Sequence, residues 1–170
     1  MHFRIAFLFL LLFSILRVFS QTDSLFCSSK DSICAQTEGI DIDSLLRHAH
    51  TCLGKKYRYS GKSPKTGFDC AGFVFYNFKK FGVTLPYSSC EQIKRGTKVK
   101  KGEAQPGDLI FFQGRSTKSK RAGHVGIVVK RLSDDTIYFI HAAVTGGVRY
   151  DSTEGLYYKK RFIGLRRLKS

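Results

Sequence analysis

The chain has 170 residues, of which 42% are hydrophobic and 14% are aromatic, and its formal net charge is +16. This length suits one domain with a substantial hydrophobic core and is short for two, so we expect a single folded domain. The lysines and arginines are scattered along the chain, and no nucleic-acid-binding motif is present, so we exclude nucleic acid as a partner.

The first segment is almost entirely apolar over residues 3–19, although Arg4 and Arg17 interrupt it. The run is short for a membrane span, and a polar stretch follows from Ser20. This pattern is typical of a secretory signal peptide over residues 1–20, cleaved near Ser20, with an N-terminal membrane anchor as the alternative. Its removal leaves 27 basic and 13 acidic residues, a net charge of +14, which favours attraction to anionic cell-wall polymers.

The cysteine count bears on the compartment and on the presence of a free thiol. Five cysteines are present, at Cys27, Cys34, Cys52, Cys70 and Cys90. A secreted protein meets an oxidising environment, and an odd count leaves one thiol over. If Cys70 is a nucleophile, it must be that thiol, and the other four would form two bridges in one of three connectivities. The alternative is that all five cysteines are reduced.

Residues 21–40 show no periodicity, and we interpret them as an extended leader to a domain that covers residues 41–170. Apolar residues then recur at helical spacing over residues 42–53, with Asp41 or Asp43 as the N-cap and a glycine at the end. The helix also carries two histidines, which we interpret as surface or packing residues, namely His48 and His50.

A second helix is predicted over residues 71–81, between the N-cap Asp69 and the C-cap glycine Gly82. The helix is apolar nearly all round, so we expect it to be buried. Cys70 lies at its start, where unpaired backbone N–H groups and the helix dipole favour a thiolate. The alternative is that Cys70 is a small buried apolar residue without a chemical role.

A short third helix is expected to end at Gly96 and to begin with a capping box, formed by Ser88 with Glu91 or by Ser89 with Gln92. Beyond it, apolar residues alternate with a period of two, which predicts strands. The strands are expected at residues 108–112, 125–130, 137–142, 148–151 and 162–168. Helices followed by strands with hairpin connections indicate an α+β fold with an antiparallel sheet.

Two histidines lie in the predicted strands. His124 precedes one strand, His141 ends the next, and Ser133–Thr136 forms the turn between them. Because a hairpin brings its two ends together, we expect His124 and His141 to be neighbours facing the helix start at Cys70. A thiol, a base and a group that orients the base are the parts of a cysteine nucleophile site. A zinc site made of the same three residues is the competing interpretation.

Six segments of the chain form a recognisable series of motifs, namely Lys56–Gly61, Gly67–Val74, Gly82–Pro86, Gln105–Phe112, Gly123–Val128 and Ile140–Ala142. Taken together, these segments resemble the successive motifs of the NlpC/P60 cysteine peptidases. The resemblance covers roughly residues 46–168 and keeps the order of the family. It implies a papain-like α+β fold, with N-terminal helices packed on a central antiparallel sheet. It also implies hydrolysis of peptidoglycan stem peptides, typically between D-glutamate and diaminopimelate or lysine.

The resemblance further implies roles for individual residues. Cys70 would be the nucleophile, His124 the base and His141 the third, orienting residue. Tyr57 matches a family tyrosine whose hydroxyl lies near the nucleophile and helps to bind the oxyanion, and the backbone N–H of Cys70 is a further donor for that purpose. No metal and no cofactor are expected.

Two departures from the family pattern concern the substrate-binding region, to which we assign Asp69 and Ala71 as well as Tyr57. Many family members carry a serine where this chain has Ala71, and an aromatic residue that is often tryptophan is here Tyr59. The missing serine contacts the substrate in many members, so its replacement bears on substrate preference.

The sequence therefore predicts a secreted or periplasmic cysteine peptidase of the cell envelope. We expect it to act on peptidoglycan peptides, to associate peripherally with the wall and to be a monomer. One alternative is an amidase or acyltransferase on the same fold, since hydrolysis and transfer share an acyl-enzyme. The other is a catalytically inactive module that binds the wall through the same groove.

Overall fold

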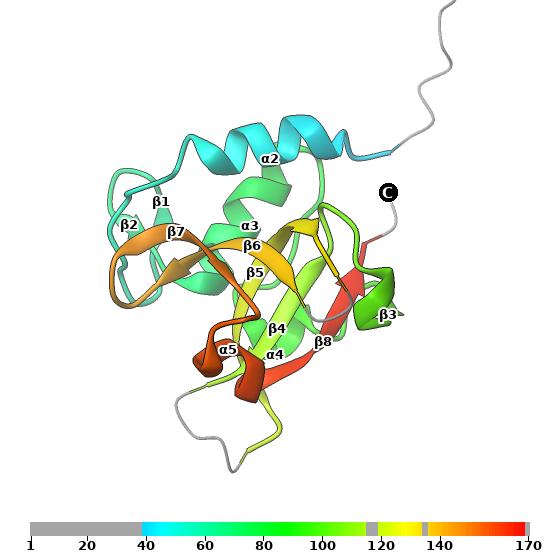
Figure 1. Cartoon of the computed structure of the whole chain (residues 1–170). Coiled ribbons are helices and arrows are strands. Elements are labelled where there is room, and N and C mark those ends of the chain that lie inside the picture. Colours follow the sequence, from blue (N-terminus) through cyan, green and yellow to red (C-terminus); the bar gives the residue numbers. More distant parts are fainter. Residues whose placement is uncertain (1–38, 115–118, 134–135, 169–170) are drawn as a thin grey trace, which may run out of the picture. The chain divides into compact units, whose positions relative to one another are not determined.

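The structure is a computed structural model, and it describes residues 39–114, 119–133 and 136–168 (Figure 1). The expected signal peptide, almost all of the expected leader and the cysteines Cys27 and Cys34 lie outside the described residues. Within the described part of the chain, no helix is both long enough and apolar enough to span a lipid bilayer.

Helix α2 (Ile42–His50) begins as the sequence predicts, with Asp41 as its N-cap. The Asp41 carboxylate accepts a hydrogen bond from the backbone N–H of Ser44 at 3.2 Å, which satisfies one of the unpaired donors at the helix start. The helix ends earlier than expected, because Thr51 already acts as the C-cap and the chain continues in turns up to Gly54.

Helix α3 (Cys70–Lys80) is the buried helix predicted from the sequence, and its N-cap is Asp69. The Asp69 carboxylate accepts from the backbone N–H of Gly72 at 2.6 Å. Gly82 follows the helix in the left-handed region, with φ of +80°, as expected of a C-cap glycine. A Cβ atom at Gly72 would lie 2.0 Å from the carbonyl oxygen of Gly61. The helix therefore lies so close to the preceding loop that only glycine fits at this position.

Helix α4 (Ser89–Gln92) is a single turn, and the capping box predicted for it is not formed. Its N-cap Ser88 makes no side-chain hydrogen bond to the helix. The Gln92 side chain is instead buried, and its amide nitrogen donates to the backbone carbonyls of Ala71 at 3.1 Å and Pro86 at 2.7 Å. The side chain that the sequence pattern assigned to the cap is thus used to fix the chain against the start of α3.

Six antiparallel strands form the central sheet, in the order β3-β8-β4-β5-β6-β7 (Figure 1). Their bounds are β3 (Thr97–Val99), β4 (Leu109–Gln113), β5 (Ala122–Arg131), β6 (Ile137–Ala143), β7 (Gly147–Ser152) and β8 (Phe162–Arg167). The five strands predicted from the sequence are confirmed. The unpredicted elements are β3, the ribbon of β1 (Lys62–Ser63) and β2 (Gly67–Phe68), the 3-10 turn η1 (Lys101–Glu103) and α5 (Leu156–Arg161).

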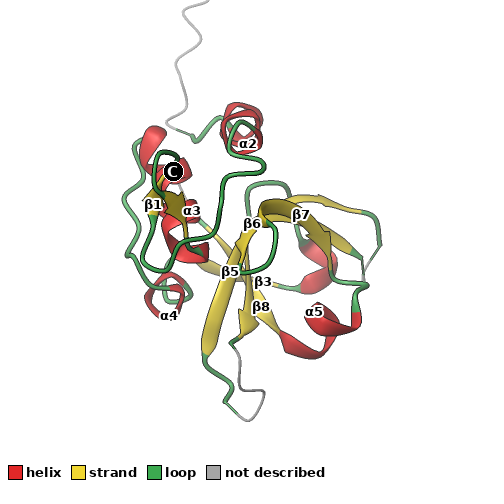
Figure 2. Ribbon diagram, turned by 90° about the vertical axis from the view of Figure 1, so that its left-hand side faces the viewer, coloured by secondary structure: helices red, strands yellow, loops and turns green. Residues whose placement is uncertain are grey.

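The sheet separates helices α2, α3 and α4 on one side from α5 on the other (Figure 2). The larger core cluster joins α2 and α3 to one face of the sheet and includes Leu45, Phe73 and Ile127. A second cluster on the opposite face includes Phe112 and Phe139, and Tyr158 of α5 packs against it. The α+β class and the packing of N-terminal helices on an antiparallel sheet are therefore confirmed.

Candidate active site

The Cys70 thiol lies at the first position of α3, and the preceding chain fixes where that helix begins. Tyr57 forms an isolated bridge with Phe68, and the backbone N–H of Phe68 donates to the carbonyl of Lys56 at 3.1 Å. Cys70 itself is half-buried, and the backbone N–H of Val125 lies near enough to its sulfur to lower the thiol pKa. Since Val125 follows His124 along β5, the thiol lies next to the strand segment that contains this histidine.

His124 and His141 are neighbours on β5 and β6, as the predicted hairpin requires. Their Nε2 and Nδ1 atoms are 2.6 Å apart, and their ring centroids are 4.8 Å apart. The strand register pairs Ile127 with Ile140, so Gly126 lies across from His141 and His124 is its diagonal neighbour on the same face. A Cβ at Gly126 would be 3.2 Å from the His141 Cβ, so the glycine leaves room for this pair.

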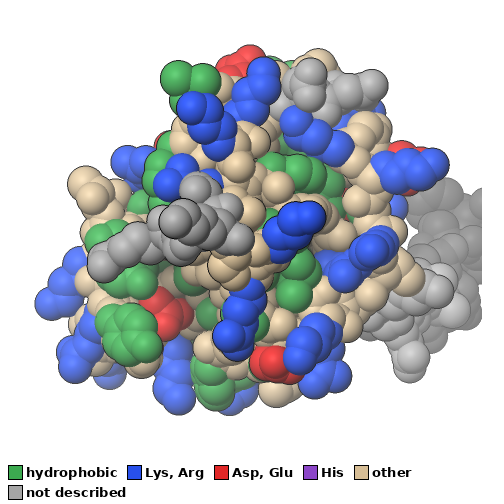
Figure 3. Space-filling model, turned by 90° about the horizontal axis from the view of Figure 1, so that it is seen from below, with side chains coloured by type: hydrophobic (Ala, Val, Ile, Leu, Met, Phe, Trp, Pro, Cys, Tyr) green, Lys and Arg blue, Asp and Glu red, His purple; other side chains and the backbone are tan. Residues whose placement is uncertain are grey.

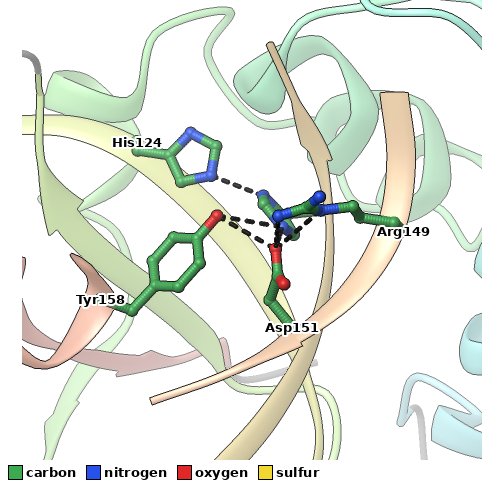
Figure 4. A network of polar contacts seen from close by, with 5 residues as sticks. His124, Arg149, Asp151 and Tyr158 are labelled. Atoms are coloured by element: carbon green, nitrogen blue, oxygen red, sulfur yellow. Dashed lines mark hydrogen bonds and ion pairs between the residues drawn. The ribbon is translucent and has the colours of Figure 1, made fainter. Parts of the chain in front are cut away.

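Three further residues, which the sequence analysis missed, extend the pair into a network (Figure 4). The buried His141 places its Nε2 atom 2.8 Å from Oδ2 of Asp151 on β7. The same oxygen accepts from Nε of Arg149 at 2.9 Å and from the hydroxyl of Tyr158 at 3.1 Å. The signal in the sequence was the alternation in Gly147–Ser152, which directs Arg149 and Asp151 to one face of the strand.

The network fixes where the protons lie on the two imidazole rings. Burial raises the pKa of Asp151, but the hydrogen bonds from His141 and Arg149 outweigh it, and the net pKa is lowered. Asp151 is therefore a carboxylate and only accepts, so Nε2 of His141 carries a proton. Burial lowers the pKa of His141, which leaves its Nδ1 as an acceptor from Nε2–H of His124. The free lone pair of His124 is then on Nδ1.

The thiol and the adjacent imidazole are both neutral in the resting protein. Burial, and then the charge of Asp69, raises the pKa of Cys70 to about 11. Burial, and then the charge of His141, lowers the pKa of His124 to about 3. The backbone N–H groups of Cys70 and Ala71 at the helix start do lower the thiol pKa, but burial and the charge of Asp69 outweigh them. Asp69 already binds the N–H of Gly72 and adds a negative charge beside the sulfur.

The residues assigned to substrate binding lie around the helix start in different environments. Tyr57 is half-buried, and burial raises the pKa of its hydroxyl. Asp69 is the N-cap of α3. Ala71 is only 4% exposed and belongs to the core cluster, so its methyl group offers almost no surface to a substrate.

The two other histidines of the described ranges pack against other parts of the fold, as expected. Nδ1 of His48 lies 2.8 Å from the amide oxygen of Asn77, and Nδ1 of His50 lies 2.8 Å from the hydroxyl of Tyr150. Within the described ranges, no group of three or more His, Cys, Asp and Glu side chains is arranged to hold a metal ion.

Two cysteines other than Cys70 lie within the described residues, and neither forms a bridge. Cys52 is buried and Cys90 is partly exposed, and both are free thiols. The expectation of two bridges is therefore wrong for these two residues. The Cys90 sulfur lies 2.7 Å from the carbonyl oxygen of Ala122, so it links α4 to β5 without a covalent bond.

A thiol at the start of a buried helix, next to a chain of imidazole, imidazole and carboxylate on an antiparallel sheet, defines the class of papain-like cysteine hydrolases. The sequence profile of the NlpC/P60 family matches residues 54–167. The chain belongs to this family.

Several relatives and solved structures resemble the chain. A probable endopeptidase from Haemophilus influenzae is 39% identical over 128 residues, which are 75% of this chain and 74% of the relative. The murein DD-endopeptidase MepS/murein LD-carboxypeptidase from Escherichia coli is 35% identical over 153 residues, covering 89% of this chain and 76% of the relative. A probable endopeptidase p60 from Listeria seeligeri is 38% identical, but the chain covers only 22% of its length. The crystal structure of an NlpC/P60 family protein from Bacillus cereus superposes with a TM-score of 0.69 at 29% identity, over 78% of this chain and 41% of that one.

Proposed function

We propose that this protein is a cysteine peptidase that hydrolyses peptidoglycan stem peptides through Cys70, His124 and His141. The observation that carries the proposal is the hydrogen-bonded chain from His124 through His141 to Asp151, next to the thiol at the start of α3. A module that only binds the wall needs neither a thiol nor a base with an oriented free nitrogen, so this observation favours an enzyme.

In the proposed mechanism, Nδ1 of His124 takes the thiol proton while the Cys70 sulfur attacks the carbonyl carbon, because both groups start neutral. Asp151, acting through His141, stabilises the imidazolium that forms. The backbone N–H of Cys70 and the hydroxyl of Tyr57 bind the oxyanion. His124 then gives its proton to the leaving amine, and it later activates the water that hydrolyses the thioester.

The proposed scissile bond joins D-glutamate to diaminopimelate or lysine in the stem peptide. A second candidate is a DD bond or a terminal LD bond. It is favoured by the 35% identity to the Escherichia coli relative, whose name gives both of those activities. All of these bonds are amides, so the same three residues serve each of them, and the choice depends on the cavity beside His124.

We further propose that the mature protein works as a monomer in the cell envelope and associates peripherally with the wall. Lys and Arg side chains are spread over the face seen in Figure 3, where Asp and Glu are few. Without residues 1–20, the charge is that of 27 basic and 13 acidic residues, or +14. Exposed charges are screened within about 10 Å at 0.1 M salt, so binding to intact sacculi should weaken markedly as salt rises. Binding that does not depend on salt would contradict this part of the proposal.

The experiment that tests the activity is digestion of purified peptidoglycan, followed by mass spectrometry of the released fragments. The mature protein should produce peptides with a new amino terminus and a new carboxyl group, and Cys70→Ala should produce none. Products joined to an added amine would favour the acyltransferase alternative. If Cys70→Ala digests peptidoglycan as well as the wild type does, the proposal is wrong. If the wild type binds sacculi without digesting them, the inactive module is favoured.

A further inference from the structure

A cavity next to His124 has a composition that suits a small anion. Its volume is about 310 Å³, close to the lower end for small-ligand sites. The described residues that line it are His124, Ala143, Val144, Thr145, Arg149, Tyr157 and Tyr158. Because the pKa of His124 is about 3, Arg149 is the single charged side chain among these lining residues at neutral pH.

Arg149 is fixed on its inner side and open on its outer side. Oδ2 of Asp151 accepts from Nε at 2.9 Å and lies 2.8 Å from Nη2, which uses two of the five N–H donors of the guanidinium. The Nη1 atom lies beside Gly146, in the turn that joins β6 to β7. The side chain of Arg149 is 45% exposed, whereas that of Asp151 is 22% exposed and does not line the cavity. An anion that enters therefore meets the guanidinium first.

Part of the cavity wall is hydrocarbon that is open to solvent. Val144 is 74% exposed and Tyr157 is 55% exposed. Both lie at the same cavity as Arg149, so a ligand here would contact hydrocarbon on one side and a cation on the other. An amino acid with a free carboxylate and a short aliphatic part has this chemistry.

We infer that this cavity binds the amino acid that leaves the substrate, through a free carboxylate held by Arg149. The inference rests on the proposed function, in which His124 donates its proton to the leaving amine. The residue that contains this amine must then lie beside His124, which is where the cavity is. Diaminopimelate has two carboxyl groups and a terminal alanine has one, so each scissile bond that releases either of them fits the same subsite.

The test compares substrates that differ only in this carboxylate. The probes are the tripeptide L-Ala-γ-D-Glu-diaminopimelate and a cross-linked muropeptide dimer, each prepared with the carboxyls of the leaving residue free or amidated. A hydrogen bond to a charged group, lost on amidation, corresponds to about a tenfold change or more. The wild type should cleave the free acid at least tenfold more efficiently than the amide, mainly through KM. Equal kcat/KM for acid and amide would overturn the inference.

Two variants separate carboxylate binding from the contact between Arg149 and Asp151. Arg149→Gln should remove the preference, so that acid and amide react alike, whereas the exposed control Arg47→Gln on α2 should keep it. A variant that loses activity equally on both substrates and keeps the preference would show that Arg149 only holds Asp151. Isothermal titration of Cys70→Ala with the same tripeptides measures binding without hydrolysis. Tighter binding of the acid supports the subsite even if the wild type fails to hydrolyse any wall peptide, and equal binding refutes it.

Discussion

Replacement of Asp151 by asparagine tests the hydrogen-bonded chain most directly, because it removes the charge and preserves the shape of the side chain. His124 becomes positively charged when it takes the thiol proton. The negative charge of Asp151 raises the pKa of His124. The Asp151 carboxylate contacts His141 at 2.8 Å, and the His141 and His124 rings are 4.8 Å apart. Two unit charges roughly 8 Å apart interact by about 2 kcal/mol at an effective dielectric constant of 20.

A loss of about 2 kcal/mol from the transition state corresponds to roughly a thirtyfold fall in kcat. KM should change little, because Asp151 does not line the cavity beside His124. The assay is steady-state kinetics of Asp151→Asn on one wall peptide, with circular dichroism to establish folding. Asp43→Asn, at an exposed position of α2, removes the same charge far from the site and should leave kcat unchanged. An unchanged kcat for Asp151→Asn, or a loss confined to KM, would refute the role given to this carboxylate.

Three further predictions concern the two histidines, the pH dependence of the reaction and the packing at the start of α3. His124→Ala should be nearly inactive because it removes the base, whereas His141→Gln should retain measurable kcat/KM because an amide still hydrogen-bonds the ring; the reverse order of losses would contradict the assigned roles. The loss of kcat/KM at acid pH should be centred near pH 3, not near 6.5, because His124 is a base only when neutral and its pKa is about 3. A loss centred near 6.5 would contradict this prediction. Gly72→Ala should lower the urea midpoint of unfolding, because the new Cβ would lie 2.0 Å from a backbone oxygen. This is the opposite of the usual effect, since Gly→Ala within a helix normally stabilises by about 1 kcal/mol. Gly164→Ala meets nothing within 4 Å and is the matched control.

The sequence predicted those parts of the fold that depend on local pattern. The helix over Cys70–Lys80 was visible because an N-cap aspartate, an apolar run and a C-cap glycine occur in the right order. The strands were visible through alternation. Short β3 and the six-residue α5 were missed, because neither is long enough to show a period, and tertiary pairing with β8 decides where β3 lies.

The sequence predicted those parts of the site that the geometry of a single hairpin determines. His124 and His141 could be placed together because one turn joins their strands. Asp151 could not be placed, because it contacts His141 through the pairing of β6 with β7, and a one-residue change in that register would direct it to the other face. The raised pKa of Cys70 was also beyond sequence reasoning. The helix start favours a thiolate, and only the structure shows that burial and Asp69 outweigh that effect.

The pairing of β5 with β6 has a consequence for engineering this protein. The ladder pairs Arg131 with Ile137 at one end of the hairpin, and the two histidines lie toward the other end. A peptide tag inserted between residues 132 and 136 would lengthen the connection without shifting any pair in the ladder. One extra residue between Val125 and Val128 would instead turn His124 away from His141. The hairpin therefore offers an attachment point for a reporter at one end and tolerates no change of length at the other.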